Sequence, residues 1–144
     1  MKPYFLALAA AALLLAAPAR AQEDLIATQL DSATVLMAGS GYQPLSDVVR
    51  GTLPAGEDEE FPVELRAGVR YVILGVCDGG CSDVDLVLVD AAGGEAGADR
   101  ELDDVPVVSF QAPADGRYVV KVEMATCGTG NCGYGVRVYH APAQ

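Results

Sequence analysis

The sequence predicts an all-β protein, an antiparallel β-sandwich of seven or eight short strands preceded by one helix and a signal peptide. Three observations support this fold class. Short segments rich in Val and Tyr alternate apolar with polar residues, clusters of turn-forming residues separate these segments, and no helical period occurs among them. This pattern is typical of two sheets that each bury one face against the other.

The first 21 residues have the features of a signal peptide. Lys2 precedes an apolar run from Tyr4 to Ala17, and Pro18-Ala-Arg-Ala21 ends in the small-x-small pattern that signal peptidase cuts. The run has 14 residues, fewer than the roughly 20 that a transmembrane helix needs. We therefore expect a mature chain that begins at Gln22, is exported to the periplasm or the medium and has no stable membrane anchor. An uncleaved anchor is the alternative.

The charge balance excludes one class of partner. The chain has 20 Asp plus Glu, nine Lys plus Arg and a formal net charge of −11. Lys2 and Arg20 leave with the leader, so the mature chain carries 20 acids, seven bases and a net charge of −13. Nucleic-acid binding needs clustered cations, so we expect no nucleic-acid partner. The single His cannot supply the two or three imidazoles of most catalytic metal sites.

Residues 22–45 are predicted to form an amphipathic helix and a linker. Apolar residues recur every three or four positions between Glu23 and Ala38 and would form one stripe, made of Ile26, Leu30, Ala33 and Met37. Gly39 and Gly41 are expected to end the helix. The stripe either covers an open face of the sandwich or docks on a partner.

The sandwich itself is predicted over residues 46–144, where four segments alternate clearly. Their core-facing positions are Phe61, Val63, Leu65, Val84, Leu86, Leu88, Tyr118, Val120, Val122, Met124, Val136 and Val138. Twice, a Tyr-containing strand leads to a Cys, a Gly-containing loop and a second Cys. This repetition favours a β-hairpin at each pair of cysteines.

The four cysteines form two close pairs. Cys77 and Cys81 enclose Asp-Gly-Gly, and Cys127 and Cys132 enclose Gly-Thr-Gly-Asn. In an oxidising compartment four cysteines most often form two disulfides, and the simplest pairing joins 77 with 81 and 127 with 132. A crossed pairing, a four-thiolate zinc site and a redox role are the alternatives, although zinc prefers shorter spacings and a redox pair belongs at a helix N-terminus.

Acidic residues gather near the first cysteine pair and before Val105. Asp78, Asp83 and Asp85 form one group, and Asp103 and Asp104 belong to the other. Calcium takes six to eight oxygen ligands, several of them carboxylates. These five aspartates are therefore candidate calcium ligands, and one ion would bridge Asp83 and Asp85 because both lie on one face of a strand. The alternative is a solvated acidic rim that keeps the protein soluble.

No pattern of residues indicates an enzyme. Asp83 and Asp85 would have to act as the acid and base of a glycosidase without a Trp platform for the sugar or a means of raising one pKa. A Ser-His-Asp triad would have to use His140, close to the end of the sequence, where chains fray. We expect no catalysis.

Residues 58–139 resemble the bacterial pre-peptidase C-terminal domain family. The resemblance rests on a rhythm of short strand motifs: Phe61-Pro-Val-Glu-Leu65, Gly68-Val-Arg-Tyr71, Asp83-Val-Asp85-Leu86, Asp115-Gly116-Arg-Tyr118 and Gly133-Tyr134. It implies a jelly-roll-like sandwich in secreted proteins, non-catalytic and in some members binding calcium or a fibrous substrate. Asp83 and Asp85 fill the Asp-x-Asp positions of the family. The acidic segment 57–60 stands where calcium-binding members carry a calcium linker.

The functional expectation follows from the leader, this resemblance and the acidic residues. We expect a non-catalytic exported binding or structural module, with calcium as a candidate stabiliser and a protein or an extracellular polymer as partner. The alternative is a partner-dependent regulator, such as a protease inhibitor or an envelope chaperone, that docks through the N-terminal helix.

Overall fold

The structure is a computed structural model that describes residues 20–142. The predicted signal peptide lies outside the described residues except for its last two positions. The helix α1 (Arg20–Gly39) begins two residues before the predicted mature start, Gln22. No helix in the described range is long and apolar enough to cross a membrane.

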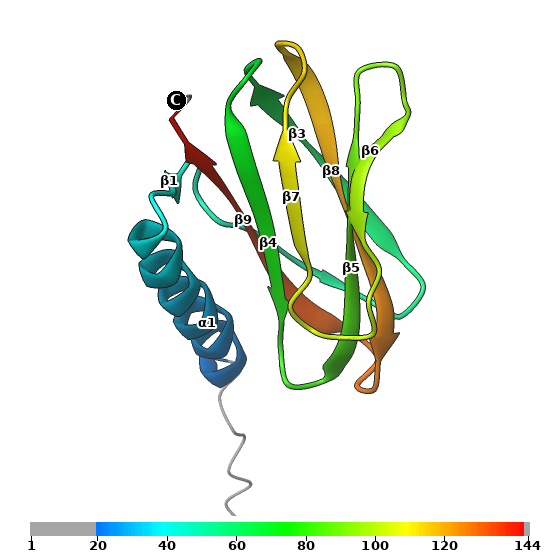
Figure 1. Ribbon diagram of the computed structural model, residues 1–144. Coiled ribbons are helices and arrows are strands. Elements are labelled where there is room, and N and C mark those ends of the chain that lie inside the picture. Colours follow the sequence, from blue (N-terminus) through cyan, green and yellow to red (C-terminus); the bar gives the residue numbers. More distant parts are fainter. Residues whose placement is uncertain (1–19, 143–144) are drawn as a thin grey trace, which may run out of the picture.

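Two antiparallel sheets face each other (Figure 1). The first has β2 (Val49–Leu53), β9 (Cys132–Ala141), β4 (Arg70–Cys77) and β7 (Val107–Gln111) side by side, and the two-residue β1 (Gln43–Pro44) also pairs with β9. The second has the order β3 (Asp58–Leu65), β8 (Gly116–Cys127), β5 (Cys81–Val89) and β6 (Glu95–Asp99). This strand order is that of a jelly roll, and the expected fold class is confirmed.

The chain changes sheet at almost every connection. Within residues 20–142, β5 and β6 are the only consecutive strands that pair with each other. The hairpins expected at the two cysteine pairs are therefore wrong, because β4 and β5 belong to different sheets, as do β8 and β9. Alternation along a strand shows which residues face the core, but it carries no information on which strand lies alongside.

The core lies between the two sheets and includes the predicted residues, although Phe61 and Val63 are only half-buried. On β8, Tyr118, Val120, Val122 and Met124 are buried, and Val84, Leu86 and Leu88 of β5 are buried beside them. Leu86 stands opposite Val122 and Leu88 opposite Val120 across the two central strands. Each such side chain contributes roughly 1.5–3 kcal/mol when it leaves water.

One edge of the sandwich is closed by a tyrosine. Tyr134 of β9 is buried, and its hydroxyl donates a hydrogen bond to the carboxylate of Glu59 on β3, in the other sheet. Burial, and then the bond to Glu59, raises the pKa of the Tyr134 phenol above its ordinary value. Part of the acidic segment 57–60 therefore joins the two sheets.

The helix α1 lies on the outer face of the first sheet (Figure 1). Ile26 and Leu30 of the predicted stripe are buried against Val72, Leu74 and Tyr139, and the rest of the stripe is half-buried there. After the helix, Gly41 takes the left-handed conformation with φ 83°, as its expected role as a helix stop requires. The stripe thus covers the sandwich and is not free to dock on a partner.

The close approach of α1 to β9 depends on Gly135. A Cβ atom at this position would lie 2.6 Å from Cγ2 of Ile26 and 2.9 Å from Cδ1 of Leu30. A larger residue would therefore push the helix away from the sheet.

We expect Gly135→Ala to lower the free energy of unfolding by about 1–3 kcal/mol, because overpacking displaces the helix. Gly116→Ala is the control, since a Cβ there has its nearest neighbour 3.9 Å away, at Cε2 of Tyr118. Urea unfolding of both variants measures the difference. Equal midpoints for Gly135→Ala and the parent would contradict this account of the helix packing.

Candidate functional site

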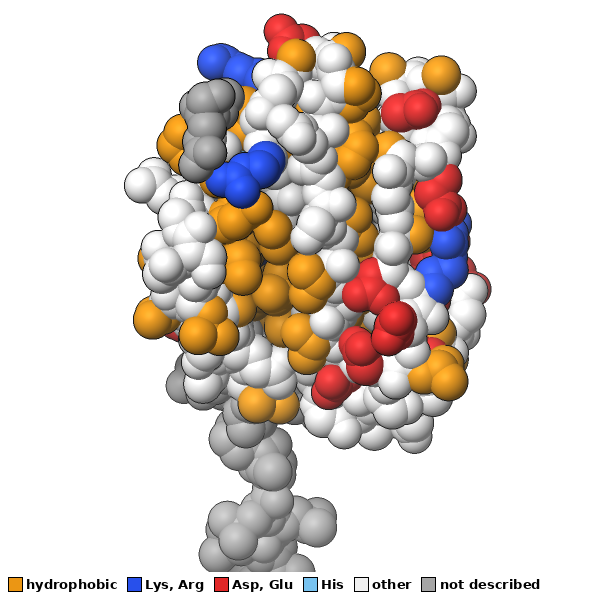
Figure 2. All heavy atoms as spheres, in the orientation of Figure 1, with side chains coloured by type: hydrophobic (Ala, Val, Ile, Leu, Met, Phe, Trp, Pro, Cys, Tyr) orange, Lys and Arg blue, Asp and Glu red, His pale blue; other side chains and the backbone are white. Residues whose placement is uncertain are grey.

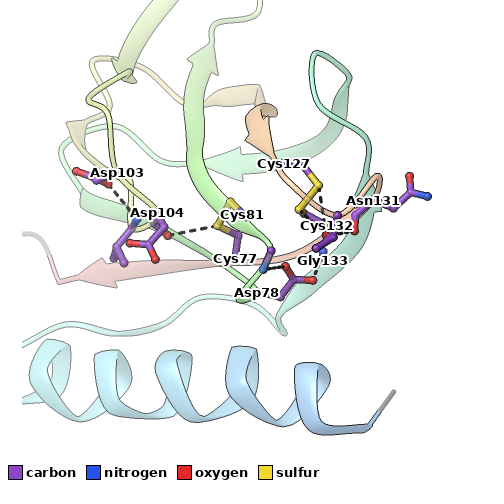
Figure 3. Close-up of a disulfide and its surroundings, with 12 residues drawn as sticks. Cys77, Asp78, Cys81, Asp103, Asp104, Cys127, Asn131, Cys132 and Gly133 are labelled. Carbon is purple, nitrogen blue, oxygen red and sulfur yellow. Dashed lines mark hydrogen bonds between the residues drawn. A yellow bond between two sulfur atoms is a disulfide. The ribbon is translucent and has the colours of Figure 1, made fainter. Parts of the chain in front are cut away.

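Two disulfides lie together at one end of the sandwich (Figure 3). Cys77 is bonded to Cys81 and Cys127 to Cys132, with Cα atoms 5.9 and 5.8 Å apart. Cys81 stands opposite Cys127 in the second sheet. The predicted pairing is confirmed, and each bridge joins the two sheets. Both enclose very short loops, so each contributes only about 2 kcal/mol on the chain-entropy model.

Asp78 connects the loop between Cys77 and Cys81 to the start of β9 by hydrogen bonds. Its side chain is 5% exposed. One carboxylate oxygen accepts a hydrogen bond from the Gly133 amide at 2.6 Å, and the other accepts from the Gly80 amide at 3.0 Å. Its own amide donates to the Gly133 carbonyl at 3.0 Å. Asp78 therefore uses both carboxylate oxygens to hold the loops (Figure 3).

The two disulfide loops also contact each other directly. The Gly128 amide donates to the Gly80 carbonyl at 2.8 Å. The Thr129 side chain packs on the Cα atom of Gly80, where a Cβ atom would lie 2.3 Å from the threonine Oγ1. We call residues 78–80 and 128–131 the double-loop tip. Apart from the buried Asp78 and the half-buried Gly80, its residues are exposed.

An acidic loop between β6 and β7 runs beside this tip. Two carboxylates hold it in place: Asp99, the last residue of β6, accepts from the Val107 amide of β7 at 2.8 Å, and Asp103 within the loop accepts from the Val105 amide at 2.9 Å. Leu102, between these acids, is 89% exposed. Figure 2 shows acidic side chains gathered at this end of the molecule, next to an apolar area of the first sheet.

The five predicted calcium ligands lie in different settings, although the Asp103 carbonyl accepts a hydrogen bond from the Val84 amide of β5 at 3.1 Å. Asp78 is bonded within the tip, Asp103 is bonded within its loop, and Asp104 is exposed. Asp83 and Asp85 both lie on β5, but the register with β8 shifts on either side of Asp83, which is buried while Asp85 is half-buried. Among residues 20–142, no group of three or more Asp, Glu, His or Cys is arranged to hold a metal ion. Calcium binding stays a prediction.

Asp85 belongs to a row of carboxylates that crosses three strands. Asp58 of β3 is opposite Glu123 of β8, and Glu123 is opposite Asp85 of β5. With Glu57 these residues line a cleft of about 290 Å³. Lys121 offsets part of their charge, because its Nζ lies 2.7 Å from Glu123 and 3.8 Å from Asp58.

The pKa of the Asp85 carboxyl is raised above its ordinary value. Burial raises its pKa first, the charges of Asp83 and Glu123 raise it further, and Arg100 opposes the shift. Asp83 is 8% exposed. One oxygen of Asp83 and one of Asp85 are buried without a hydrogen-bond partner in the described structure. The site therefore concentrates negative charge that nearby cations only partly neutralise.

From the sequence, Glu123 was not a candidate site residue, and Asp58 was one only as part of the acidic segment 57–60. They are far apart along the chain and meet because β3 and β5 both pair with β8. No local spacing signals such a meeting. His140 lies within β9, opposite Tyr71 and Gln43.

The comparisons with known proteins show a likeness in fold only. No family model and no curated protein sequence matches the chain. A periplasmic inhibitor of g-type lysozyme, PliG from Aeromonas hydrophila, is 14% identical with a TM-score of 0.50, over 65% of this chain and 84% of the inhibitor. A de novo designed double-stranded β-helix is 13% identical with a TM-score of 0.36, over 65% of this chain and 99% of the design.

We expect Asp85→Asn to stabilise the protein near neutral pH. Because the folded state raises the pKa of Asp85 above its ordinary value, ionisation costs stability as the pH rises through that window, and the amide avoids the cost. Below about pH 3 both states are protonated and the gain should vanish. Urea unfolding at pH 7 and pH 3 tests this, with Asp104→Asn as the exposed control. A gain of equal size at both values would refute the electrostatic cause.

Proposed function

We propose that this protein is an exported, non-catalytic binding module that inhibits an enzyme outside the cytoplasm. The observation that carries the proposal is the disulfide-tied jelly roll, which shares its fold with a periplasmic inhibitor of g-type lysozyme. A g-type lysozyme is accordingly the first partner to test.

The disulfides support the export part of this proposal. All four cysteines are paired, as in proteins that fold in an oxidising compartment. The leader pattern over residues 1–21 points to the same route. Together they favour the periplasm or the medium as the place where the partner is met.

The charge supports a cationic partner. The chain has 20 acidic residues against nine basic ones. The row formed by Asp58, Glu123 and Asp85 and the loop around Asp103 both present carboxylates at the surface. Complementary charge speeds association and weakens as salt is added. The proposed partner therefore carries a basic surface.

The resemblance to pre-peptidase C-terminal domains supports the same class of function. Those domains are non-catalytic modules of secreted proteins, and residues 58–139 share their rhythm of strands. Membership of that family is part of the proposal.

A second candidate is a regulator, such as a protease inhibitor or an envelope chaperone, that docks through α1. Its stripe is occupied by the sandwich, but Val35 and Leu36 on the outward side of the helix are 72% and 70% exposed. A partner of this kind would bind through that apolar pair.

We expect the mature protein to inhibit a purified g-type lysozyme at near-stoichiometric concentration in a cell-wall lysis assay. Inhibition should weaken when the salt concentration rises from about 50 to 300 mM, because the complex relies on opposite charges. Val35→Ser/Leu36→Ser is the matched variant. Full inhibition by this variant supports a surface away from α1, its loss supports the second candidate, and an uninhibited lysozyme at tenfold excess of the protein refutes the lysozyme proposal.

We also propose that calcium stabilises the sandwich through Asp83 and Asp85, whose unpartnered oxygens would supply part of its shell. Calcium at 100 times its Kd should add about 2.7 kcal/mol to the free energy of unfolding. Thermal melts with excess Ca²⁺ and with chelator measure the shift, and Asp83→Asn/Asp85→Asn should abolish it. An unchanged melting temperature of the parent protein rules out the calcium site.

A further inference from the structure

We infer that the double-loop tip is the element that docks on the partner, as a preformed wedge that enters a cleft flanked by Lys or Arg side chains. The inference rests on the proposed protein-binding function and specifies its surface. Four features of the tip carry it: its crosslinks, the contacts between its loops, its small exposed residues and the acidic loop beside it.

The crosslinks act mainly on the native loops. The two cysteines of each disulfide are only four or five positions apart in the sequence. Such short loops restrict the unfolded chain less than long ones do. The bridges therefore add comparatively little to global stability, and their larger effect is to fix the conformation of two neighbouring loops at the same end of the sandwich.

The two loops form one body. Asp78 joins the first loop to Gly133 by two hydrogen bonds. The Asp78 amide donates to the Gly133 carbonyl, and the Asp78 carboxylate accepts from the Gly133 amide. The Gly128 amide and the Gly80 carbonyl close the gap between the loops. A rigid binding element gives up little conformational entropy when it meets a partner.

The exposed part of the tip is narrow and uncharged. Its exposed residues are Gly79, Gly128, Thr129, Gly130 and Asn131. Glycines leave their backbone amides and carbonyls accessible, and the Asn131 side chain points away from the bridges (Figure 3). A small polar tip of this kind fits a cleft better than a flat surface.

The acidic loop between β6 and β7 indicates which side chains should border the partner's cleft. Asp103 and Asp104 lie beside the Cys77–Cys81 bridge (Figure 3), where the Cys77 sulfur is 3.9 Å from the Asp104 carbonyl oxygen. Leu102 projects from the same loop with 89% exposure. A partner that receives the tip would meet carboxylates and one leucine on this side. Its cleft would therefore be bordered by basic side chains and an apolar contact.

The test compares tip variants with matched controls in the g-type lysozyme assay. Asn131→Lys places a cation on the tip, and Gly80→Ala forces the Thr129 side chain to move. The controls are Ala114→Lys, in the exposed loop at the opposite end of β8, and Gly116→Ala, also at that end, where a Cβ atom would have its nearest neighbour 3.9 Å away. Melting temperatures and the mass of the unreduced protein verify that each variant is folded and fully bridged.

We expect both tip variants to inhibit at least tenfold more weakly than the parent, and both controls to stay within twofold of it. A folded Asn131→Lys variant that inhibits as well as the parent would overturn the docking role of the tip while leaving the proposed inhibitory function intact. Equal losses in Asn131→Lys and Ala114→Lys would also overturn it, because added positive charge alone would then explain the effect.

If the parent protein does not inhibit the lysozyme, that proposed function fails and a second experiment decides the docking role. A photocrosslinking residue replaces Asn131 or Ala114 in the full chain, expressed in the cells that produce it. An adduct formed from position 131 alone, and displaced by excess parent protein but not by Asn131→Lys, supports the tip. Equal adducts from both positions, or adducts from position 114 alone, overturn it, and so does the absence of any adduct from position 131.

Discussion

The removal of apolar side chains from water between the two sheets is the interaction on which the rest of the structure depends. The strands β8 and β5 supply its centre, with Val120, Val122 and Leu88 completely buried. Alternation along these strands sends every second side chain inward, so the intervening residues must face outward. The acidic row on the outer face of the second sheet is a consequence of the same alternation that builds the core.

The jelly-roll connectivity places the double-loop tip at one end of the sandwich. Because the chain passes from one sheet to the other at both cysteine loops, each disulfide joins two sheets and not two neighbouring strands. Asp78 then adds hydrogen bonds across the same end. Asp78, which the sequence suggests as a metal ligand, therefore holds the conformation of the tip through its hydrogen bonds.

The acidic residues on the sheet face and those of the β6–β7 loop differ in burial and in hydrogen bonding. Asp85 lies among other carboxylates on a partly buried sheet face, which raises its pKa. Asp103 of the β6–β7 loop instead accepts a hydrogen bond from the Val105 amide and is exposed to solvent. The helix α1 takes no part in either group, since it covers the opposite sheet and buries its apolar stripe there. The outer face of the first sheet is therefore the one that the helix covers.

The sequence by itself determined the fold class, the inward residues of the main strands, the helix with its stripe and the pairing of the cysteines. These features follow from local periodicity and short spacings, which need no knowledge of distant residues. Only the tertiary structure decided that the cysteine loops cross between sheets, that Asp58, Glu123 and Asp85 meet, and that the helix stripe packs on β4 and β9. Strand register and sheet order arise from contacts between residues far apart in the chain, and one sequence carries no local signal for them.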